Sequence, residues 1–531
     1  MEIQAPLPVK GRAALRLVFK KGLQVEAARL PASLLAKGAA HDPWVRFDEL
    51  SPEGKRWALA ALFPEDRWRE EEVQHLVRWP ELESVWLISS LFTGHGQNYD
   101  KVQDANPRLP EKLRQGDCWR IPRDLLSVEL GGTRKRGIDR SLPEDDLDDE
   151  ARVAAYRSLL SFEEDKAGKY AAYRLRKGEA LYSSVVMRYT DRVDPKDVND
   201  LAQEIAARSG IDDVRSIPPG TLIRIPIRYL AAPFQPEGTK ALQEEREIRA
   251  EVRRTPRVDG GPSLKGVRIV LDPGHGGVDR GAMANGVWES DYVYDIVMRV
   301  RRILEQDTDA QVSTTLRYPS IGFRCREEIL TPTRDAEILT TPPFGNDGES
   351  PNAVSVHLRW VLANDGFAAF RLKGDARKTL FLSFHADSLH PSARGTMVYV
   401  PGAAGVPPRV NLTATHGVRV AEMKRGGSFS STAKERLQGE ARSRQLAEAL
   451  LQVMQHDKIS VHSNRPIRNI IRRAGRSFVP AVLRNSAASA KVLLEVVNLT
   501  NEEDAACFQD PKFRERYAEA VVKGIRAYFK L

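Results

Sequence analysis

Four residues in the second half of the chain have the types and positions needed for metal-assisted hydrolysis. They are His275, Glu289, His385 and Glu495. Each follows or opens an apolar segment, so each can lie at the end of its own helix or strand. Two histidines and a carboxylate are common zinc ligands, and a further carboxylate can accept a proton from water. The four residues therefore predict the site of a zinc hydrolase.

His275 lies in a glycine-rich loop that follows a predicted strand. The apolar, β-branched run Val267–Leu271 ends in Asp-Pro-Gly, and His275 comes next, ahead of Gly276 and Gly277. Ligands bind beyond such strand ends in open α/β sheets. A glycine-rich loop could instead hold phosphate, but 274–277 matches neither the dinucleotide nor the P-loop fingerprint.

Glu289 is expected at the start of an amphipathic helix, fourteen residues after His275. Apolar residues then recur with helical spacing at Val293, Ile296, Val297, Val300, Ile303 and Leu304. A glutamate in the first turn can also serve as a capping residue, or be favoured by the helix dipole alone. The nearby histidine favours the interpretation of Glu289 as a metal ligand.

His385 and Glu495 each follow a predicted buried strand, 378–384 and 491–494. A carboxylate within an apolar run is costly unless a cation or a cleft accounts for it.

Asp272 and Asn364 are candidates for orienting a ligand or shaping the loop, and they could equally be structural hydrogen-bonding residues.

The chain has 531 residues with 41% hydrophobic and 29% charged content, which predicts several soluble folded units. We predict an unassigned region 1–72, a module 73–123, a charged linker 124–169, a module 170–228, a linker 229–264 and a domain 265–531. The linkers are expected where glycine, proline and charge accumulate, and the charged Glu/Arg stretch of the second linker could be helical.

The two modules end alike, in Gly-Asp-Cys-Trp-Arg-Ile-Pro (116–122) and Gly-Thr-Leu-Ile-Arg-Ile-Pro (220–226). Each is expected to run strand, helix, helix, strand, which gives small α+β units. This plan resembles the LysM module. The resemblance implies binding of N-acetylglucosamine-containing glycan strands, and the alternative is a small module of the same shape without glycan affinity.

Residues 266–531 resemble the zinc-dependent N-acetylmuramoyl-L-alanine amidases of the cell-separation type (type 3). The resemblance rests on ordered motifs: Ile-Val-Leu-Asp-Pro-Gly-His-Gly-Gly (269–277), Arg-Trp-Val-Leu-Ala-Asn (359–364), Phe-Leu-Ser-Phe-His-Ala-Asp-Ser (381–388), Gly-Thr-Met-Val-Tyr-Val (395–400), Asn-Arg-Pro-Ile (464–467) and Val-Leu-Leu-Glu-Val-Val-Asn-Leu-Thr-Asn (492–501). It implies an α/β catalytic domain with a twisted, mostly parallel sheet flanked by helices.

The same resemblance implies one Zn²⁺ held by His275, Glu289 and His385, with Glu495 as the catalytic base. The substrate would be peptidoglycan, cleaved between N-acetylmuramic acid and L-alanine of the stem peptide. The long stretch 401–440 follows the second histidine, where some family members carry a segment that blocks the metal, so it is a candidate lid or a plain loop. A protein activator is a further candidate partner.

Two rival functions stay open. The chain could be a wall-binding protein whose amidase domain is silent or autoinhibited, or a zinc peptidase that cuts within the stem peptide. The net charge of +9 fits an acidic partner, but the basic clusters are short and no nucleic-acid module is recognised.

No apolar run is long enough for a membrane span, and the first residues show no signal peptide. An extracytoplasmic location, in the periplasm or cell wall, is therefore expected from the substrate only. The three cysteines form no CxxC pair, so a thiolate metal site is not expected.

Overall fold

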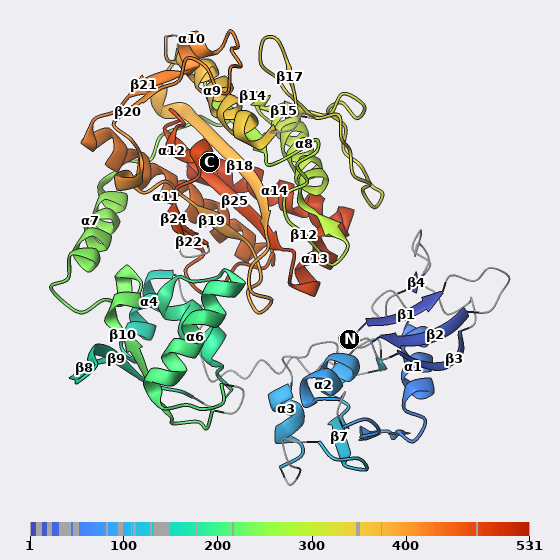
Figure 1. Cartoon of the computed structure of the whole chain (residues 1–531). Coiled ribbons are helices and arrows are strands. Elements are labelled where there is room, and N and C mark those ends of the chain that lie inside the picture. The colour runs from blue at the N-terminus through green and yellow to red at the C-terminus, as the bar shows by residue number, and fades with distance from the viewer. Residues whose placement is uncertain are drawn as a thin grey trace. The chain divides into compact units, whose positions relative to one another are not determined.

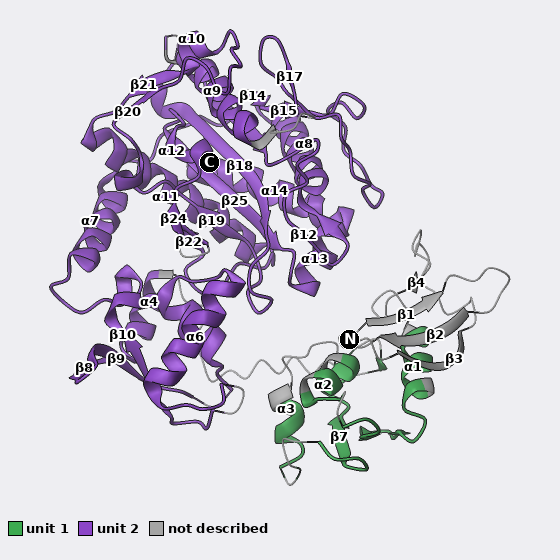
Figure 2. Cartoon of the chain, in the orientation of Figure 1, with its two compact units in different colours: residues 1–146 green, residues 147–531 purple. Residues whose placement is uncertain are grey.

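The structure is a computed structural model that separates into two compact units, 1–146 and 147–531 (Figure 2). It describes residues 2–6, 13–18, 24–30, 44–45, 52–80, 83–93, 99–107, 109, 113–127, 130–131, 149–176, 178–214, 217–346, 351–372, 374–473 and 476–529.

The first unit contains a small module with a buried apolar core. Strand β6 (Glu72–Leu76) pairs antiparallel with β7 (Cys118–Pro122), and helices α2 (Val85–Thr93) and α3 (Tyr99–Asp104) lie between them in sequence. Val73, Trp119 and Ile121 are fully buried and alternate with half-buried or exposed residues. The order strand, helix, helix, strand is the one expected for 73–123. The other elements of this unit are β1 (Glu2–Pro6), β2 (Ala13–Val18), β3 (Gln24–Leu30), β4 (Trp44–Val45), α1 (Pro52–Leu62) and β5 (Arg67–Trp68).

A second module of similar order opens the larger unit. Strand β9 (Gly168–Arg174) pairs antiparallel with β8 (Ser161–Asp165) and β10 (Leu222–Pro226). Between β9 and β10 come the π-helical segment η5 (Leu181–Met187), α5 (Arg188–Thr190) and α6 (Pro195–Ser209).

Both predicted linkers contain folded helices, and only the helix in the first linker was not expected. Helix α4 (Asp149–Arg157) and β8 lie in the tract 124–169, and α7 (Lys240–Arg254) lies in 229–264. Val153 of α4 is buried in the core of the second module, and Ile248 of α7 is buried as well. The charged composition therefore belongs to the outer faces of amphipathic helices.

A twisted sheet forms the centre of the remaining domain (Figure 1). In the described residues its strand order is β14-β11-β18-β25-β19-β22, and every pairing is parallel except that of β19 with β25. The strands are β11 (Arg268–Pro273), β14 (Gln311–Thr314), β18 (Thr379–Asp387), β19 (Met397–Tyr399), β22 (Ile467–Arg468) and β25 (Ala490–Asn498). The expected mostly parallel α/β sheet is confirmed.

Helices cover both faces of this sheet. Helices α8 (Glu289–Asp307), α11 (Ala433–His456) and α14 (Pro511–Tyr528) pack in one core with Leu271, Leu382 and Leu494. Helices α9 (Pro351–Arg371) and α12 (Ala481–Arg484) pack on the other face, against Phe381 and Leu493. Because side chains alternate along a strand, residues 383, 385 and 495 share the second face.

Shorter elements border the domain. They are β12 (Met283–Ala284), β13 (Val287–Trp288), β15 (Leu316–Arg317), β16 (Glu337–Ile338), β17 (Phe344–Gly345), β20 (Arg409–Asn411), α10 (Met423–Gly426), β21 (Ser428–Ser430), β23 (Ile471–Arg473), β24 (Arg476–Phe478) and α13 (Glu502–Gln509). Segment 401–440 contains β20, α10 and β21, and α10 packs on α9, where a Cβ on Gly426 would meet the carbonyl oxygen of Val361.

The second module is docked on the domain that contains the six-stranded sheet. Leu389, Ala393 and Met397 of the domain are buried in the same apolar cluster as the module's core. Asp191 of the module forms an ion pair with Arg465. Further contacts are the stacked rings of Tyr182 and His390, whose centroids are 5.7 Å apart, and a 2.8 Å hydrogen bond from Arg152 to the carbonyl of Ser463. The module is thus part of the larger unit's fold.

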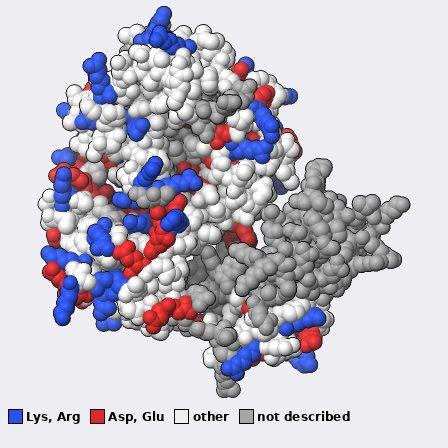
Figure 3. Space-filling view, in the orientation of Figure 1, with Lys and Arg blue, Asp and Glu red and all other residues white. Residues whose placement is uncertain are grey.

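In the part of the chain that the structure describes, no helix combines the length and apolarity of a membrane span. On the face of the larger unit seen in Figure 3, basic and acidic side chains are interspersed.

Candidate metal centre and active site

The loop after β11 holds His275 in a left-handed conformation, with a φ of 58°. Arg359 of α9 fixes this loop, because its guanidinium donates hydrogen bonds to the carbonyl oxygens of Pro273 and His275. Asp272 forms a buried ion pair with Arg359 at 2.8 Å and accepts hydrogen bonds from Thr315 and Ser383. Asp272 therefore shapes the loop through Arg359.

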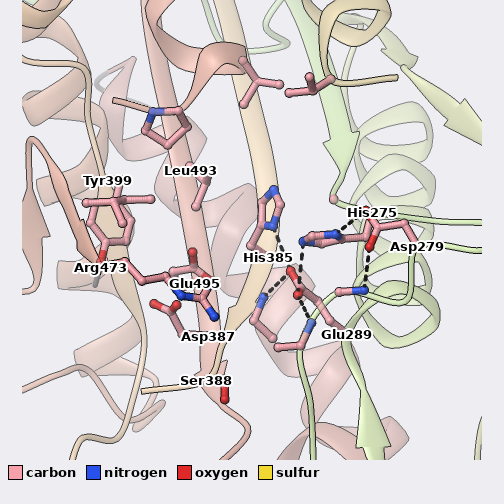
Figure 4. Close-up of a pocket in the computed structure, with 18 of the residues that line it drawn as sticks. His275, Asp279, Glu289, His385, Asp387, Ser388, Tyr399, Arg473, Leu493 and Glu495 are labelled. Carbon is pink, nitrogen blue, oxygen red and sulfur yellow. Dashed lines mark hydrogen bonds and ion pairs between the residues drawn. The ribbon is translucent and has the colours of Figure 1, made fainter. Parts of the chain in front are cut away.

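Asp279 orients the His275 ring. Its Oδ2 lies 2.7 Å from Nδ1 of His275, which leaves Nε2 directed at Glu289 (Figure 4). A carboxylate on one imidazole nitrogen fixes the tautomer and raises the basicity of the other nitrogen. His275 is thereby prepared to bind a cation through Nε2.

Glu289 begins α8 and is buried, with 3% of its surface exposed. Its Oε1 lies 2.8 Å from Nδ1 of His385 and accepts a hydrogen bond from the backbone of Ala386. Its Oε2 lies 3.3 Å from Nε2 of His275 and accepts from the backbone of Ala282. The carboxylate thus bridges the two imidazoles.

His385 and Glu495 are register partners on the adjacent parallel strands β18 and β25. Strand β18 continues to Asp387, so His385 lies within the strand rather than after it, and the register shifts between His385 and Asp387. Alternation places Asp387 on the same face as His385. In Figure 4, Glu495 and Asp387 lie together on one side of His385, and His275 lies on the other.

His275, Glu289 and His385 can each offer one ligand atom, and these atoms all lie within 4.8 Å of one another. Two imidazoles and a carboxylate form a donor set that suits zinc and leaves a position for water. Burial alone lowers the pKa of His275, but the carboxylates of Glu289 and Asp279 outweigh it and raise that pKa. The site thus favours positive charge, which a divalent cation would supply.

Burial alone raises the pKa of Glu289, but the imidazoles of His275 and His385 outweigh it and lower the pKa. Glu289 is therefore held as a carboxylate. Burial raises the pKa of Glu495 well above the usual range, and the neighbouring Asp387 and Glu289 add to this rise. Burial also raises the pKa of Asp387, to about 7.

Two buried carboxylate oxygens, Oε2 of Glu495 and Oδ2 of Asp387, have no hydrogen-bond partner among the described residues. A buried acceptor without a partner is costly, so it marks a place where a cation, water or substrate belongs. These oxygens fit a hydrolytic site beside the three candidate ligands.

All these groups line one cavity of about 720 Å³. Its walls come from the β11 loop, the start of α9, strands β18 and β25, the hairpin β23–β24 and the second module, which contributes Val193 and Asp194. The segment 401–440 supplies none of the described lining residues. The lid stays a prediction.

The structure brings together His275, Glu289, His385 and Glu495, and places Asp272 beside them. Asn364 lies elsewhere: its amide donates to the carbonyls of Gly426 and Asn485 and accepts from the backbone of Ala487. These contacts agree with the alternative that Asn364 is a structural hydrogen-bonding residue. Asp279 and Asp387 were missed. Asp387 could have been found, because it lies two residues after His385.

Comparison with known proteins gives a family match over this domain. Residues 269–527 match the family model described as N-acetylmuramoyl-L-alanine amidase. An endolysin of Bacillus phage SPP1 is 34% identical over 107 residues, which are 19% of this chain and 33% of the relative. A protein described as an uncharacterized cell wall amidase of Bacillus anthracis is 25% identical over 267 residues, 50% of this chain and 36% of the relative. The chain spans about a third of the length of these relatives.

Solved structures of similar domains cover half of the chain. The N-acetylmuramyl-L-alanine amidase of Mycobacterium smegmatis has 20% identity and a TM-score of 0.30, over 50% of this chain and 98% of that one. An N-acetylmuramoyl-L-alanine amidase of Nostoc punctiforme has 23% identity and a TM-score of 0.29, over 50% and 98%.

Proposed function

Residues 269–527 belong to the N-acetylmuramoyl-L-alanine amidase family, and on this premise we propose that the chain hydrolyses peptidoglycan. The bond cleaved is the amide between N-acetylmuramic acid and the L-alanine of the stem peptide. The observation that carries the proposal is the convergence of His275, Glu289 and His385 beside the buried carboxylate of Glu495.

His275, Glu289 and His385 would hold one zinc ion. Zinc in such a donor set lowers the pKa of a water molecule to about 7 and polarises a carbonyl. Asp279 keeps the His275 ring in the ligating orientation through its hydrogen bond to Nδ1. Arg359 keeps the loop at the strand end through its bonds to Pro273 and His275.

Glu495 is the general base in this proposal. Its raised pKa makes its carboxylate a stronger base than that of an ordinary glutamate. It accepts the proton of the attacking water and passes it to the nitrogen of the departing alanine. The cavity that surrounds it is lined by both polar and apolar residues, which suits a glycopeptide.

Replacement of Glu495 by Gln tests this assignment. The variant keeps the size of the side chain and removes the base, so cleavage of a soluble muramoyl peptide should fall at least about 100-fold. Zinc content measured on the same sample should stay at the wild-type level. Glu305→Gln, on the outer face of α8, is the matched control and should keep activity. Wild-type cleavage by Glu495→Gln would remove Glu495 from the mechanism.

The two modules are proposed to bind glycan strands, which would bring the domain to the wall and imply action outside the cytoplasm. Support comes from the strand, helix, helix, strand order of each. Deletion of 1–146 should lower co-sedimentation with insoluble peptidoglycan while cleavage of soluble fragments persists. Undiminished co-sedimentation would leave the first module without this role. A protein activator stays a prediction.

A further inference from the structure

Arg473 lies at the rim of the catalytic cavity, at the end of strand β23 of the hairpin β23–β24. Its side chain is 70% exposed, and its Nε lies 3.9 Å from Oδ2 of Asp194 in the second module. Figure 4 shows Arg473 beside Glu495 and Asp387, on the side away from His275 and Asp279. The guanidinium is therefore open to a ligand in the cavity.

Asp194 is held in place by its own module. It is the N-cap of α6, where its Oδ1 accepts hydrogen bonds from the backbone of Lys196 and Asp197. The preceding residue, Val193, accepts a 2.9 Å hydrogen bond from the backbone of His390 in the catalytic domain. Because Oδ1 serves the helix, Oδ2 is the oxygen that faces Arg473.

The position of Arg473 relative to Glu495 indicates which part of the substrate would contact Arg473. In the proposed reaction Glu495 passes its proton to the nitrogen of the departing alanine, so the departing peptide must lie on the side of Glu495. Arg473 lies on that side. The guanidinium therefore meets the peptide and not the sugar.

We propose that Arg473 binds a carboxylate of the departing stem peptide and that Asp194 is the positioning residue that aims it. This inference rests on the proposed amidase function and adds a substrate class, peptides with a free carboxylate close to the alanine. A guanidinium presents several donors in a fixed fork that matches a carboxylate. The second module thereby takes part in substrate selection at the zinc site.

Two soluble substrates test the proposal with the full zinc-loaded chain. Both are N-acetylmuramoyl-L-alanyl-D-glutamate derivatives, one with a free α-carboxylate and the other with that group amidated. We expect the wild type to have a lower KM for the carboxylate. Arg473→Gln should raise this KM about tenfold, as for loss of one charge-assisted hydrogen bond, and change the amide's KM by no more than about twofold. Arg473→Lys should restore part of the difference.

Asp194→Asn isolates the positioning role, because asparagine also caps helices well and only the charge facing Arg473 is removed. It should shift the KM for the carboxylate in the same direction by a smaller factor. Arg476→Gln, on the partner strand of the hairpin, is the control and should change neither KM.

Equal effects of Arg473→Gln on the two substrates, or no effect on either, would overturn the inference. Failure of the wild type to release alanyl peptide from either substrate would instead overturn the proposed function, so the two failures are distinct.

Discussion

Glu289 joins the parts of the site, because each of its oxygens contacts one imidazole and one backbone amide. Sequence could predict it together with His275, His385 and Glu495, since each adjoins a recognisable apolar run. It could not predict the role of Asp279, because the contact of Asp279 with His275 depends on how the loop between them turns. Nor could it predict Asp194 and Arg473, since their proximity depends on docking between segments far apart in the chain.

A residue network in the first unit should make the stability of that unit depend on pH. His75 is buried in the first unit, with Nδ1 2.9 Å from Asp66 and Nε2 2.9 Å from Glu83. Burial alone lowers the pKa of His75, but the two carboxylates outweigh it and raise the pKa to about 9. Because the folded-state pKa exceeds the unfolded value, the charged imidazole stabilises the fold below pH 6.5, and this stabilisation is lost as the pH rises through 9.

The free energy of unfolding of the first unit should therefore fall by about 3 kcal/mol between pH 6.5 and 9. Urea unfolding followed by tryptophan fluorescence measures it, because six of the eight tryptophans lie in residues 1–146. His75→Gln should be less stable at pH 6.5 and should lose this dependence. A wild-type stability that is flat over the interval would contradict the assignment of a charged His75.

At the scale of elements, the loop between β11 and α8 determines whether the ligands can converge. Gly281 has a φ of 69°, and a Cβ there would lie 2.3 Å from Oε2 of Glu289 and 2.8 Å from Cδ2 of His275. Gly286 has a φ of 72°, and no atom lies within 4 Å of its Cβ position. Both glycines adopt a similar positive φ, and they differ in the atoms that an added methyl group would contact.

Gly281→Ala should weaken zinc binding at least about tenfold, because displaced ligands lose their geometry. Gly286→Ala carries similar backbone strain and should keep the wild-type zinc affinity. Competition with a chromogenic chelator measures both constants. Equal losses in the two variants would mean that strain, and not contact with Glu289, governs the site.

The order of strands and helices was largely predictable, because apolar alternation and helical spacing are local properties. Helix α4 was not, since it carries many charges and shows its apolar face only against the core that it covers. Charge density alone therefore does not separate a linker from an amphipathic helix.

At the scale of the whole molecule, the second module and the catalytic domain share one fold. The module covers Leu389, Ala393 and Met397 and supplies a wall of the catalytic cavity. Residues 147–531 should therefore cleave a soluble muramoyl peptide with a kcat/KM within about twofold of the full chain, since no step of the chemistry lies in the first unit.

Truncation to 236–531 keeps α7 but removes the module, and it exposes this apolar patch. It should be less soluble or lose at least about tenfold in kcat/KM, because exposed apolar surface favours aggregation and the cavity loses a wall. Yield, thermal unfolding and kinetics of the two truncated chains give the comparison. A stable 236–531 chain with full activity would show that docking of the second module is needed neither for stability nor for catalysis.

The identity of the cleaved bond is the most direct test of the central claim. Peptidoglycan fragments digested by the zinc-loaded chain are labelled at new amino termini and analysed by mass spectrometry. We expect peptides that begin with L-alanine and glycans with a free lactyl carboxylate, both lost on chelation and restored by zinc. Fragments that keep the sugar–alanine amide would identify a peptidase, and no products from the zinc-loaded chain would indicate a silent or autoinhibited domain; either result would contradict the account.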